Sequence, residues 1–569
     1  MNWKTGLAVL VALIVGLATL FSIATRLPAP PEHQVFINGE VITMDASNRV
    51  VQALSVRNDR IEAVGSTADI MALVTSSTDI VDLHGGTLLP GFIDAHGHFP
   101  GSGLNTVAVD LNSPPIGNVG TMAQLLAALA ERAAITPAGD WVSGFGYDDT
   151  ALAESRHPTR EELDSVSDEH PVAVLHISGH MAVANSRALA EVGIDETTPN
   201  PEGGVIVRSN DTGELTGLLE ETARLPVVEK MLDLGVVDLF RMIGSAVREY
   251  AAHGVTTAQA GGAGPEMVRG FVLANRLGTI PLRLMVFPLE ADFRELVLAG
   301  DYEPEEYERD RLQMGAVKII ADGSIQGYTG YLTRPYHQPF HGDAEYRGYP
   351  AVLRERLFEQ VLRLHSAGFQ LAVHGNGDAA IDDILDAFAA AQAAYPVSDP
   401  RFILIHSQMA RKDQIERMRE LGVTPSFFAA HTWYWGDRHH DIFLGPERAA
   451  TISPAAWAEA AGLRFSSHMD TPVTPMRPLQ AAWSLVQRET YAGRVLGPEQ
   501  RVDAMTALRA VTIDAAWQIF QEDNRGSLEP GKYADLVVLS GSPLAEPSAM
   551  RDLRVKQTYV GGALIFTDS

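Results

Sequence analysis

The sequence predicts an α/β fold, a TIM-like (β/α)8 barrel, and three observations lead to this prediction. Short apolar runs alternate with helical patterns through the middle of the chain, as in the βαβ units of a parallel sheet. Several of these runs end in His, Lys or Asp, which strand interiors rarely hold unless the group is paired or binds metal. β-rich segments at both ends of the chain predict a small composite β-sandwich built from the two termini.

The first β-rich flank, residues 34–87, consists of short strand-like runs separated by turns. The run QVFINGEVITMD is expected to form a hairpin around Asn38 and Gly39. The C-terminal runs GSLEPGKYADLVVLS and VKQTYVGGALIF have the same character. The expected domains are a leader and linker (1–32), the first part of the sandwich (33–88), the barrel (89–510) and the second part of the sandwich (511–569).

Eight apolar runs in the middle of the chain are candidate barrel strands, enough for one complete ring. Apolar residues at three- and four-residue steps predict helices between several of them, at residues 353–368, 378–394 and 411–422. The candidate strands are residues 91–96, 254–259, 282–287, 316–321, 369–374, 402–406, 422–427 and 463–469.

One connection, from about residue 100 to 245, is too long for a simple loop. It contains a helical pattern, TMAQLLAALAERAA, and two strand-like runs, WVSGFGYD and PVAVLHISG. We interpret it as a large insertion after the first barrel strand. An insertion at that position emerges on the active-site face of the barrel, where it can roof a pocket.

The composition excludes several kinds of partner and site. Lys and Arg number 44 against 71 Asp and Glu, a formal charge of −27, which opposes binding to nucleic acid. There is no cysteine, so disulfides, thiolate ligands and cysteine nucleophiles are excluded. Any metal must be held by imidazole, carboxylate or a modified lysine, a ligand set that suits zinc, manganese, iron or nickel.

The N-terminus has the features of a membrane segment. An uncharged apolar run follows Lys4 and ends at Arg26, close to the roughly 20 residues that cross a bilayer. Lys4 predicts that this end stays in the cytoplasm. The run is therefore expected to be an uncleaved signal anchor, a transmembrane helix that tethers an exported enzyme at the periplasmic or extracellular face. Ser22 and Ala24 leave the alternative of a cleaved signal and a secreted enzyme.

Six residues at or near the ends of the candidate strands are the expected metal ligands. In parallel barrels the active site is built at the carboxyl ends of the strands, so these residues are expected to converge. His96 and His98 are two residues apart and can face one ion from a strand, although two exposed loop histidines are the alternative. The six are His96, His98, Lys318, His374, His406 and Asp470.

Lys318 lies within the apolar run 316–320, where a charged ammonium is costly unless it is paired or neutralised. A neutral lysine can react with CO2 to give a carbamate, whose two oxygens can bridge two metal ions. The sequence therefore makes Lys318 a candidate for carboxylation. The alternative is a lysine paired with Asp322 or with a substrate carboxylate.

His374 and His406 end two successive strands and are expected to hold a second metal through neutral imidazoles, although a lone strand histidine is more often a core residue. Asp470 closes the last strand. A carboxylate beside a metal-activated water can accept its proton and pass it to a leaving group, and the alternative is an Asp that caps a turn. Asp470 and Lys318 are thus the candidate catalytic residues.

Four further residues are candidate substrate contacts. His180 lies in the insertion, in SGHMAVANS, and a structural role for it is equally open. His431 and Trp433 follow the seventh strand in HTWYWGDRHH, an aromatic segment that suits either an apolar acyl or aryl pocket or packing under a lid. Tyr328 follows Lys318 and is the fourth candidate.

The segments LLPGFIDAHGHF, WVSGFGYD, SGHMAVANSRAL, VKIIADGSIQGYTGYL, VHGNGDAAID, LIHSQ, HMDTPVTPMRPL and GSLEPGKYADLVVLS resemble the amidohydrolase superfamily, in particular its amidohydrolase-3, YtcJ-like branch. The resemblance runs from about residue 34 to the C-terminus. It implies a metal-dependent barrel with a composite β-sandwich, hydrolysis of C–N or related bonds, a metal site at the histidines and aspartate named above, and carboxylation of Lys318. Two segments depart from the family pattern: HGNGD replaces an HAIGD-type segment, and His468 and Met469 separate Ser467 from Asp470.

We therefore predict a metal-dependent amidohydrolase that holds one or two divalent ions, with zinc expected. It is predicted to cleave an amide, N-acyl, cyclic amide or urea-like bond of a small molecule through a metal-activated water. Hydrolysis of an ester or lactone at the same site is the first alternative. A catalytically silent, anchored binding protein is disfavoured because all six ligand positions are filled, and an iron-dependent oxygenase because the ligands exceed a two-His-one-carboxylate set. Self-association into a homo-oligomer is left open.

Overall fold

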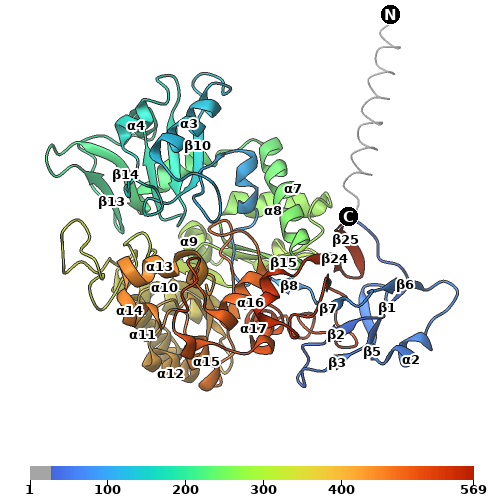
Figure 1. Ribbon diagram of the computed structural model, residues 1–569. Coiled ribbons are helices and arrows are strands. Elements are labelled where there is room, and N and C mark those ends of the chain that lie inside the picture. The colour runs from blue at the N-terminus through green and yellow to red at the C-terminus, as the bar shows by residue number, and fades with distance from the viewer. Residues whose placement is uncertain (1–26, 569) are drawn as a thin grey trace, which may run out of the picture.

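A computed structural model describes residues 27–568 of the chain. Parallel strands surrounded by helices form the largest part of the molecule (Figure 1). A separate mixed sheet lies over one end of these strands, and two β layers lie at one side of the molecule. The predicted α/β fold is confirmed, and an added sheet and a β-rich flank accompany it.

Two parallel sheets carry all eight predicted barrel strands and one additional short strand, Leu312–Met314. Side chains of β20 alternate between two cores: Ile403 and Ile405 face an inner cluster, whereas Phe402 and Leu404 pack under the helices. Burial on both faces explains why these strands are continuous apolar runs. The strands are β8 (Phe92–Ile93), β15 (Val255–Ala263), β16 (Arg283–Pro288) and β17 (Leu312–Met314) in one sheet, and β18 (Val317–Ile320), β19 (Leu371–Gly375), β20 (Phe402–His406), β21 (Val423–Phe427) and β22 (Ser466–Ser467) in the other.

The two sheets are joined by single contacts and not by a continuous ladder. A parallel bridge links Leu289 to Lys318 on one side. On the other side the backbone N–H of Asp470 donates to the carbonyl of His96 at 3.2 Å, and the backbone N–H of His98 donates to the carbonyl of Thr471 at 2.7 Å. Among residues 27–568 no ladder pairs β22 with β8, so a closed hydrogen-bonded barrel is not observed. These backbone bonds nevertheless bring the ends of the first and last strands together.

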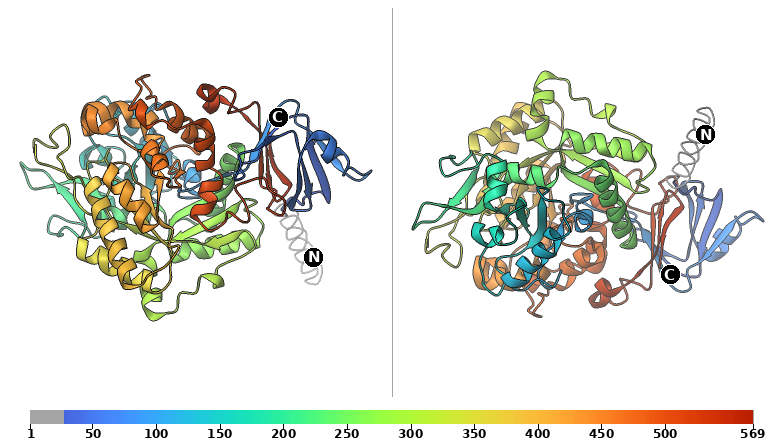
Figure 2. Two further views of the ribbon diagram at one scale, coloured as in Figure 1. Left: turned by 90° about the horizontal axis from the view of Figure 1, so that it is seen from below. Right: turned by 90° about the horizontal axis from the view of Figure 1, so that it is seen from above.

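Helices connect the parallel strands and cover their outer faces (Figure 2). The helices predicted at 353–368, 378–394 and 411–422 are confirmed, and Gly422 ends the third with φ +68°, a left-handed conformation that favours glycine. The helices of this region are α7 (Val236–Ala252), α8 (Pro265–Arg276), α9 (Glu290–Ala299), α10 (Arg354–Ser366), α11 (Asp378–Ala394), α12 (Lys412–Leu421), α13 (His431–Arg438), α14 (Gly445–Ala449), α15 (Ala455–Ala460), α16 (Pro478–Gln487), α17 (Ala504–Ala510) and α18 (Ile513–Gln518).

The long connection between β8 and β15 folds as a sheet with its own core. Its six strands have the order β13-β14-β12-β11-β10-β9, and Leu125 and Leu129 of α3 pack on them. Seen from above, this sheet overlies the parallel strands (Figure 2). Its elements are β9 (Val109–Asp110), α3 (Met122–Ala133), β10 (Val142–Tyr147), α4 (Arg160–Asp164), β11 (Val172–His176), β12 (Met181–Ala184), α5 (Ser186–Glu191), β13 (Gly204–Arg208), β14 (Leu215–Glu221) and α6 (Leu225–Met231).

The β-rich flank contains one sheet from the N-terminal part and one sheet from both ends of the chain. Phe36 of the first sheet and Tyr559 of the second meet edge to face in a shared apolar cluster. The first sheet holds β1 (His33–Ile37), β4 (Ala53–Arg57), β5 (Arg60–Gly65) and β6 (Asp79–Asp82), next to the short helix α2 (Thr67–Met71). The second holds β2 (Glu40–Ile42), β3 (Val50–Val51), β7 (Thr87–Pro90), β23 (Leu536–Leu539), β24 (Val555–Val560) and β25 (Ala563–Thr567).

The hairpin expected around Asn38 and Gly39 is wrong. β1 pairs with β4 and β6, whereas β2 pairs with β3 and β7 in the other sheet. Asn38 adopts the left-handed conformation of a tight turn, with φ +59°. The turn therefore exists, but it carries the chain from one sheet to the other because each strand finds its partners elsewhere.

The predicted membrane anchor is corrected by the structure. No helix within residues 27–568 is both long and apolar enough to cross a bilayer. The apolar run that ends at Arg26 lies outside the described residues. The signal anchor, the membrane as a partner and the tethered location are therefore withdrawn.

Candidate active site

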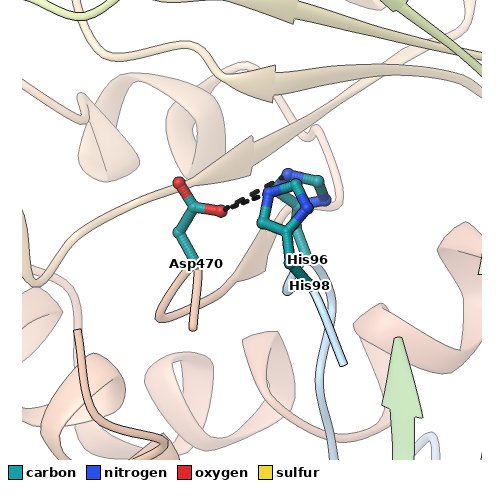
Figure 3. A group of neighbouring side chains, drawn as sticks. All are labelled: His96, His98 and Asp470. Carbon is teal, nitrogen blue, oxygen red and sulfur yellow. Dashed lines mark ion pairs between the residues drawn. The ribbon is translucent and has the colours of Figure 1, made fainter. Parts of the chain in front are cut away.

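His96, His98 and Asp470 form the centre of a polar cluster at the ends of the parallel strands (Figure 3). The two histidines follow β8, and Asp470 follows β22. Asp470 Oδ1 lies 3.2 Å from His98 Nε2 and 3.5 Å from His96 Nε2. Burial raises the pKa of Asp470, but the hydrogen bond from His98 and the nearby imidazoles outweigh it and hold that pKa well below its usual range. The carboxylate is therefore ionised and faces two ring nitrogens.

Lys318 reaches the same cluster from β18. Its side chain is buried, and Nζ lies 3.2 Å from His96 Nε2. Burial lowers the pKa of Lys318 to about 7, although Asp470 opposes this shift. The alternative partner Asp322 is engaged elsewhere, since its carboxylate accepts backbone N–H groups of the loops after β18 and β19. The lysine thus faces the imidazoles, as expected, in an environment that favours the neutral amine.

His374 and His406 lie beside this centre at the ends of β19 and β20. Their rings are 4.5 Å apart, and His406 Nε2 lies 3.9 Å from Asp470 Oδ2. Neither belongs to the group of mutually close donor atoms formed by His96, His98 and Asp470. His374 Nδ1 is 3.2 Å from Asp322 Oδ1, so this aspartate anchors both the loop and the imidazole. Burial lowers the pKa of both histidines, which keeps them neutral.

Gln259 of β15 fixes the orientation of His96. Its amide nitrogen donates to the carbonyl of Ala95 at 3.0 Å, which turns its amide oxygen toward His96 Nδ1, also at 3.0 Å. Nδ1 therefore carries the proton and Nε2 presents its lone pair to the cluster. Sequence reasoning missed Gln259 because a glutamine in a strand carries no distinctive signal.

Replacing Gln259 with leucine is expected to lower the affinity for divalent metal about 10–100-fold, the usual effect of removing the partner that orients a ligating histidine. Metal affinity can be measured by competition with a chromophoric chelator. Gln259→Glu is the matched control, because it keeps an acceptor oxygen for His96 Nδ1. Wild-type affinity in Gln259→Leu would show that His96 does not depend on this contact.

His468 is a further buried histidine that the sequence left without a role. Its ring centroid lies 5.2 Å from that of His96 and 5.1 Å from that of His406. Neither ring nitrogen has a hydrogen-bond partner among the described residues, and burial lowers its pKa to about 4. It adds a neutral imidazole to the floor of the site.

His180 extends from the insertion onto this floor. It lies between β11 and β12, and its ring centroid is 5.1 Å from that of His374. Its Nδ1 is 2.9 Å from a carboxylate oxygen of Glu221, the last residue of β14. Glu221 is buried, with a backbone φ of +49°, a strained value for a residue other than glycine. The insertion thus places a His–Glu pair directly against the candidate centre, and Glu221 was not foreseen.

The other expected substrate contacts divide into two groups. His431 of α13 is buried against Phe428 and Trp435, and burial lowers its pKa to about 3, opposed by the nearby charge of Asp470. Trp433, on the same helix, instead packs edge-on against Trp483 and Tyr491.

Tyr328 stacks on Phe340 within an aromatic cluster. The structure therefore brings His431 toward the centre and surrounds Trp433 and Tyr328 with other aromatic side chains.

A second group of donor atoms, Asp148, Asp149 and His176, lies in the insertion. The backbone N–H of Ser178 donates to His176 Nδ1, so His176 Nε2 carries the proton and donates to Asp149 at 3.1 Å. Asp148 accepts from Trp435 and Arg438 of α13. These atoms are saturated by hydrogen bonds, and the group fastens the insertion to α13.

The comparisons with known proteins agree with this geometry. The sequence profile of the Amidohydrolase family matches residues 79–566. The chain belongs to the amidohydrolase family. It is 31% identical to an N-substituted formamide deformylase of Arthrobacter pascens, over 93% of this chain and 97% of the relative. It is 27% identical to the putative amidohydrolase YtcJ of Bacillus subtilis strain 168, over 94% of this chain and 99% of the relative. The YtcJ-like resemblance is thereby confirmed.

Two solved structures share the fold. An uncharacterized metal-dependent hydrolase from Pyrococcus horikoshii superposes with a TM-score of 0.71 at 24% identity, over 90% of this chain and 98% of the other. A second such hydrolase, from Pyrococcus furiosus, superposes with a TM-score of 0.68 at 26% identity, over 90% of this chain and 100% of the other. The α/β fold of this amidohydrolase is thus shared over nearly its whole length.

Proposed function

We propose that this amidohydrolase is a metal-dependent hydrolase that removes a small acyl group from an N-substituted amide. The convergence of His96, His98 and Asp470 within 3.5 Å contacts, with Lys318 beside them, is the observation that carries the proposal. The deformylase from Arthrobacter pascens supports a small amide as substrate. His180 of the insertion and His431 of α13 are proposed to recognise the acyl and amine portions of the substrate.

The donor set fits a divalent cation. Neutral imidazoles and an ionised carboxylate are the ligands that zinc prefers when thiolates are absent, and the chain has no cysteine. His96, His98 and Asp470 would hold one ion, and His374 and His406 a second, with Lys318 between them. A bound metal supplies an activated water and polarises the substrate carbonyl.

Lys318 is proposed to be carboxylated. The neutral amine attacks CO2, a C–N bond forms and one proton leaves, which gives a carbamate with two anionic oxygens. Burial and the lowered pKa of Lys318 support this reaction because they raise the fraction of neutral amine at neutral pH.

Asp470 is proposed to move the proton during hydrolysis. As an ionised carboxylate it accepts the proton of the attacking water, and it then donates this proton to the nitrogen of the departing amine. The C–N bond breaks as that nitrogen gains its proton, so the amine leaves neutral. His98 holds Asp470 in position, since its Nε2 lies 3.2 Å from Asp470 Oδ1.

The arrangement of the chain supports a further structural proposal. The parallel strands are proposed to form a (β/α)8 barrel between residues 89 and 510, with β17 and β18 counted as one interrupted strand and the insertion at about residues 100–245. Segments 33–88 and 511–569 are proposed to form one composite β-sandwich. The buried pair Arg283–Asp535, with atoms 2.7 Å apart, supports tight joining of the sandwich to strand β16.

The function is tested by loading the purified protein with Zn2+ and measuring hydrolysis of N-substituted formamides, matched acetamides, ureas, and esters or lactones of similar size. We expect the highest kcat/KM for a formamide, and loss of turnover after metal removal that zinc restores. The metal-free protein is the control. Turnover that persists without metal would contradict a metal-dependent reaction, and a preference for the esters or lactones would overturn the amide assignment.

A further inference from the structure

A basic cavity lies outside the candidate active site, between α7, α16 and the C-terminal strands. It has a volume of about 320 Å3 and none of the candidate metal ligands lines it. Its polar wall contains Arg477, Arg551, Arg554 and His253 together with two carboxylates, Asp552 and Asp568, and its apolar wall includes Leu479. A group of arginines in one cavity is unusual in a chain with a net charge of −27, because most of the surface is acidic.

Arg551 is held rigidly at this cavity. Its guanidinium carbon lies 4.1 Å from the ring centroids of both Trp433 and Trp483, whose rings meet at nearly a right angle, so the side chain packs against two indoles at once. The indole N–H of Trp483 donates to the carbonyl of Ser548, which fixes that ring. Nη1 of Arg551 is buried and has no hydrogen-bond partner among residues 27–568. A guanidinium fixed in this way can bind an anion with little loss of side-chain entropy.

The carboxylates near the cavity leave part of its positive charge unpaired. Asp568 is shared between Arg554 at 3.5 Å and Lys556 at 2.8 Å. Asp552 lies 3.9 Å from Arg551, at the limit of an ion pair.

The remaining acidic neighbour, Glu249 of α7, accepts the backbone N–H of Met476. Within residues 27–568, the ion pairs at this cavity are formed by Arg551, Arg554 and Lys556, and none is formed by Arg477. Arg477 and Arg551 are thus the cations of this cavity that nearby carboxylates neutralise least.

The first turn of α16 adds to the positive potential. Pro478, Leu479 and Gln480 begin this ten-residue helix and line the cavity directly after Arg477. The N-terminal end of a helix carries partial positive charge, which favours an anion placed against it. Positive charge, a fixed guanidinium and an open volume therefore occur together in this cavity.

We propose that this cavity binds a small anion with a carboxylate or phosphate group, at a site separate from the candidate active site. Arg477 and Arg551 would donate hydrogen bonds to the anionic oxygens, and the apolar wall would contact the remainder of the ligand. The proposal does not depend on which bond the enzyme hydrolyses.

The test is calorimetric titration of the metal-loaded full chain with inorganic phosphate and, separately, with succinate, at constant ionic strength. We expect saturable binding of at least one of them, and at least a tenfold lower affinity in the double variant Arg477→Gln and Arg551→Gln, because charge-assisted hydrogen bonds are lost. The response to phosphate and to succinate distinguishes the two kinds of ligand.

Arg269→Gln is the matched control, since Arg269 is an exposed arginine on α8 outside the cavity. The single variant Arg477→Gln is measured alongside the double variant, and an unchanged thermal transition verifies that each is folded. The proposal is overturned if neither anion binds, or if the arginine variants bind as tightly as the wild type, the result expected for an anion held only at the metal centre.

Discussion

Replacing Lys318 with alanine is expected to remove most of the bound metal and to lower kcat/KM about 10³-fold. Lys318 is the only proposed ligand that would bridge two ions, so its loss removes several kcal/mol of charge stabilisation, at about 1.4 kcal/mol per tenfold in rate. Metal content measured by elemental analysis and steady-state turnover of the preferred amide give the two readouts. A short carboxylic acid such as acetate is expected to restore part of both, because its oxygens can replace those of the carbamate.

Lys412→Ala is the matched control for this experiment. Lys412 is exposed at the start of α12, so its replacement is expected to leave metal content and turnover at wild-type values. Full metal content and full activity in Lys318→Ala would remove the proposed bridge. Loss of both without any rescue would favour a lysine that acts through its own amine.

Replacing Asp470 with asparagine is expected to lower kcat about 10²–10⁴-fold while much of the metal remains bound. The amide keeps the size of the carboxylate and can ligate through oxygen, but it cannot accept a proton from water. The rate and its pH dependence are measured together with metal content. In the wild type, the depressed pKa of Asp470 keeps the base form present at neutral pH, and activity falls only when acid protonates it.

Asp413→Asn serves as the control because Asp413 is an exposed aspartate on α12. If Asp470→Asn keeps the pH–rate profile and the rate of the wild type, Asp470 is not the proton carrier. A variant that loses its metal completely would instead show that Asp470 acts mainly as a ligand. The metal measurement therefore separates these two roles.

Local patterns carried the successful predictions. The periodicity of α10, α11 and α12 and the apolar runs of the parallel strands report burial directly, so their positions could be read from the sequence. The polar ends of those runs likewise indicated that His96, Lys318 and Asp470 would meet, because parallel strands place their carboxyl ends together.

The residues that contact these side chains could not be predicted from the sequence in the same way. Gln259 and Glu221 contact the site through single hydrogen bonds from distant segments, and nothing in their local sequence distinguishes them. Asp322 lies close to Lys318 in the chain, but its side chain faces His374 instead. The turn at Asn38 can be recognised from the local sequence. The sheet that each flanking strand joins, however, depends on strands from distant parts of the chain. Trp433 was expected to contact substrate. A helix has two faces, however, and only the packing shows that the Trp433 side chain contacts Trp483.

The insertion that supplies His180 and Glu221 has its own sheet and its own apolar core. Lys318 and Asp470, the proposed catalytic residues, in contrast lie in or directly after the parallel strands. Exchange of this segment between relatives is therefore a route to enzymes with new selectivity: a chimera that grafts residues 109–221 from another family member would keep the chemistry and change which amine or acyl group is accepted.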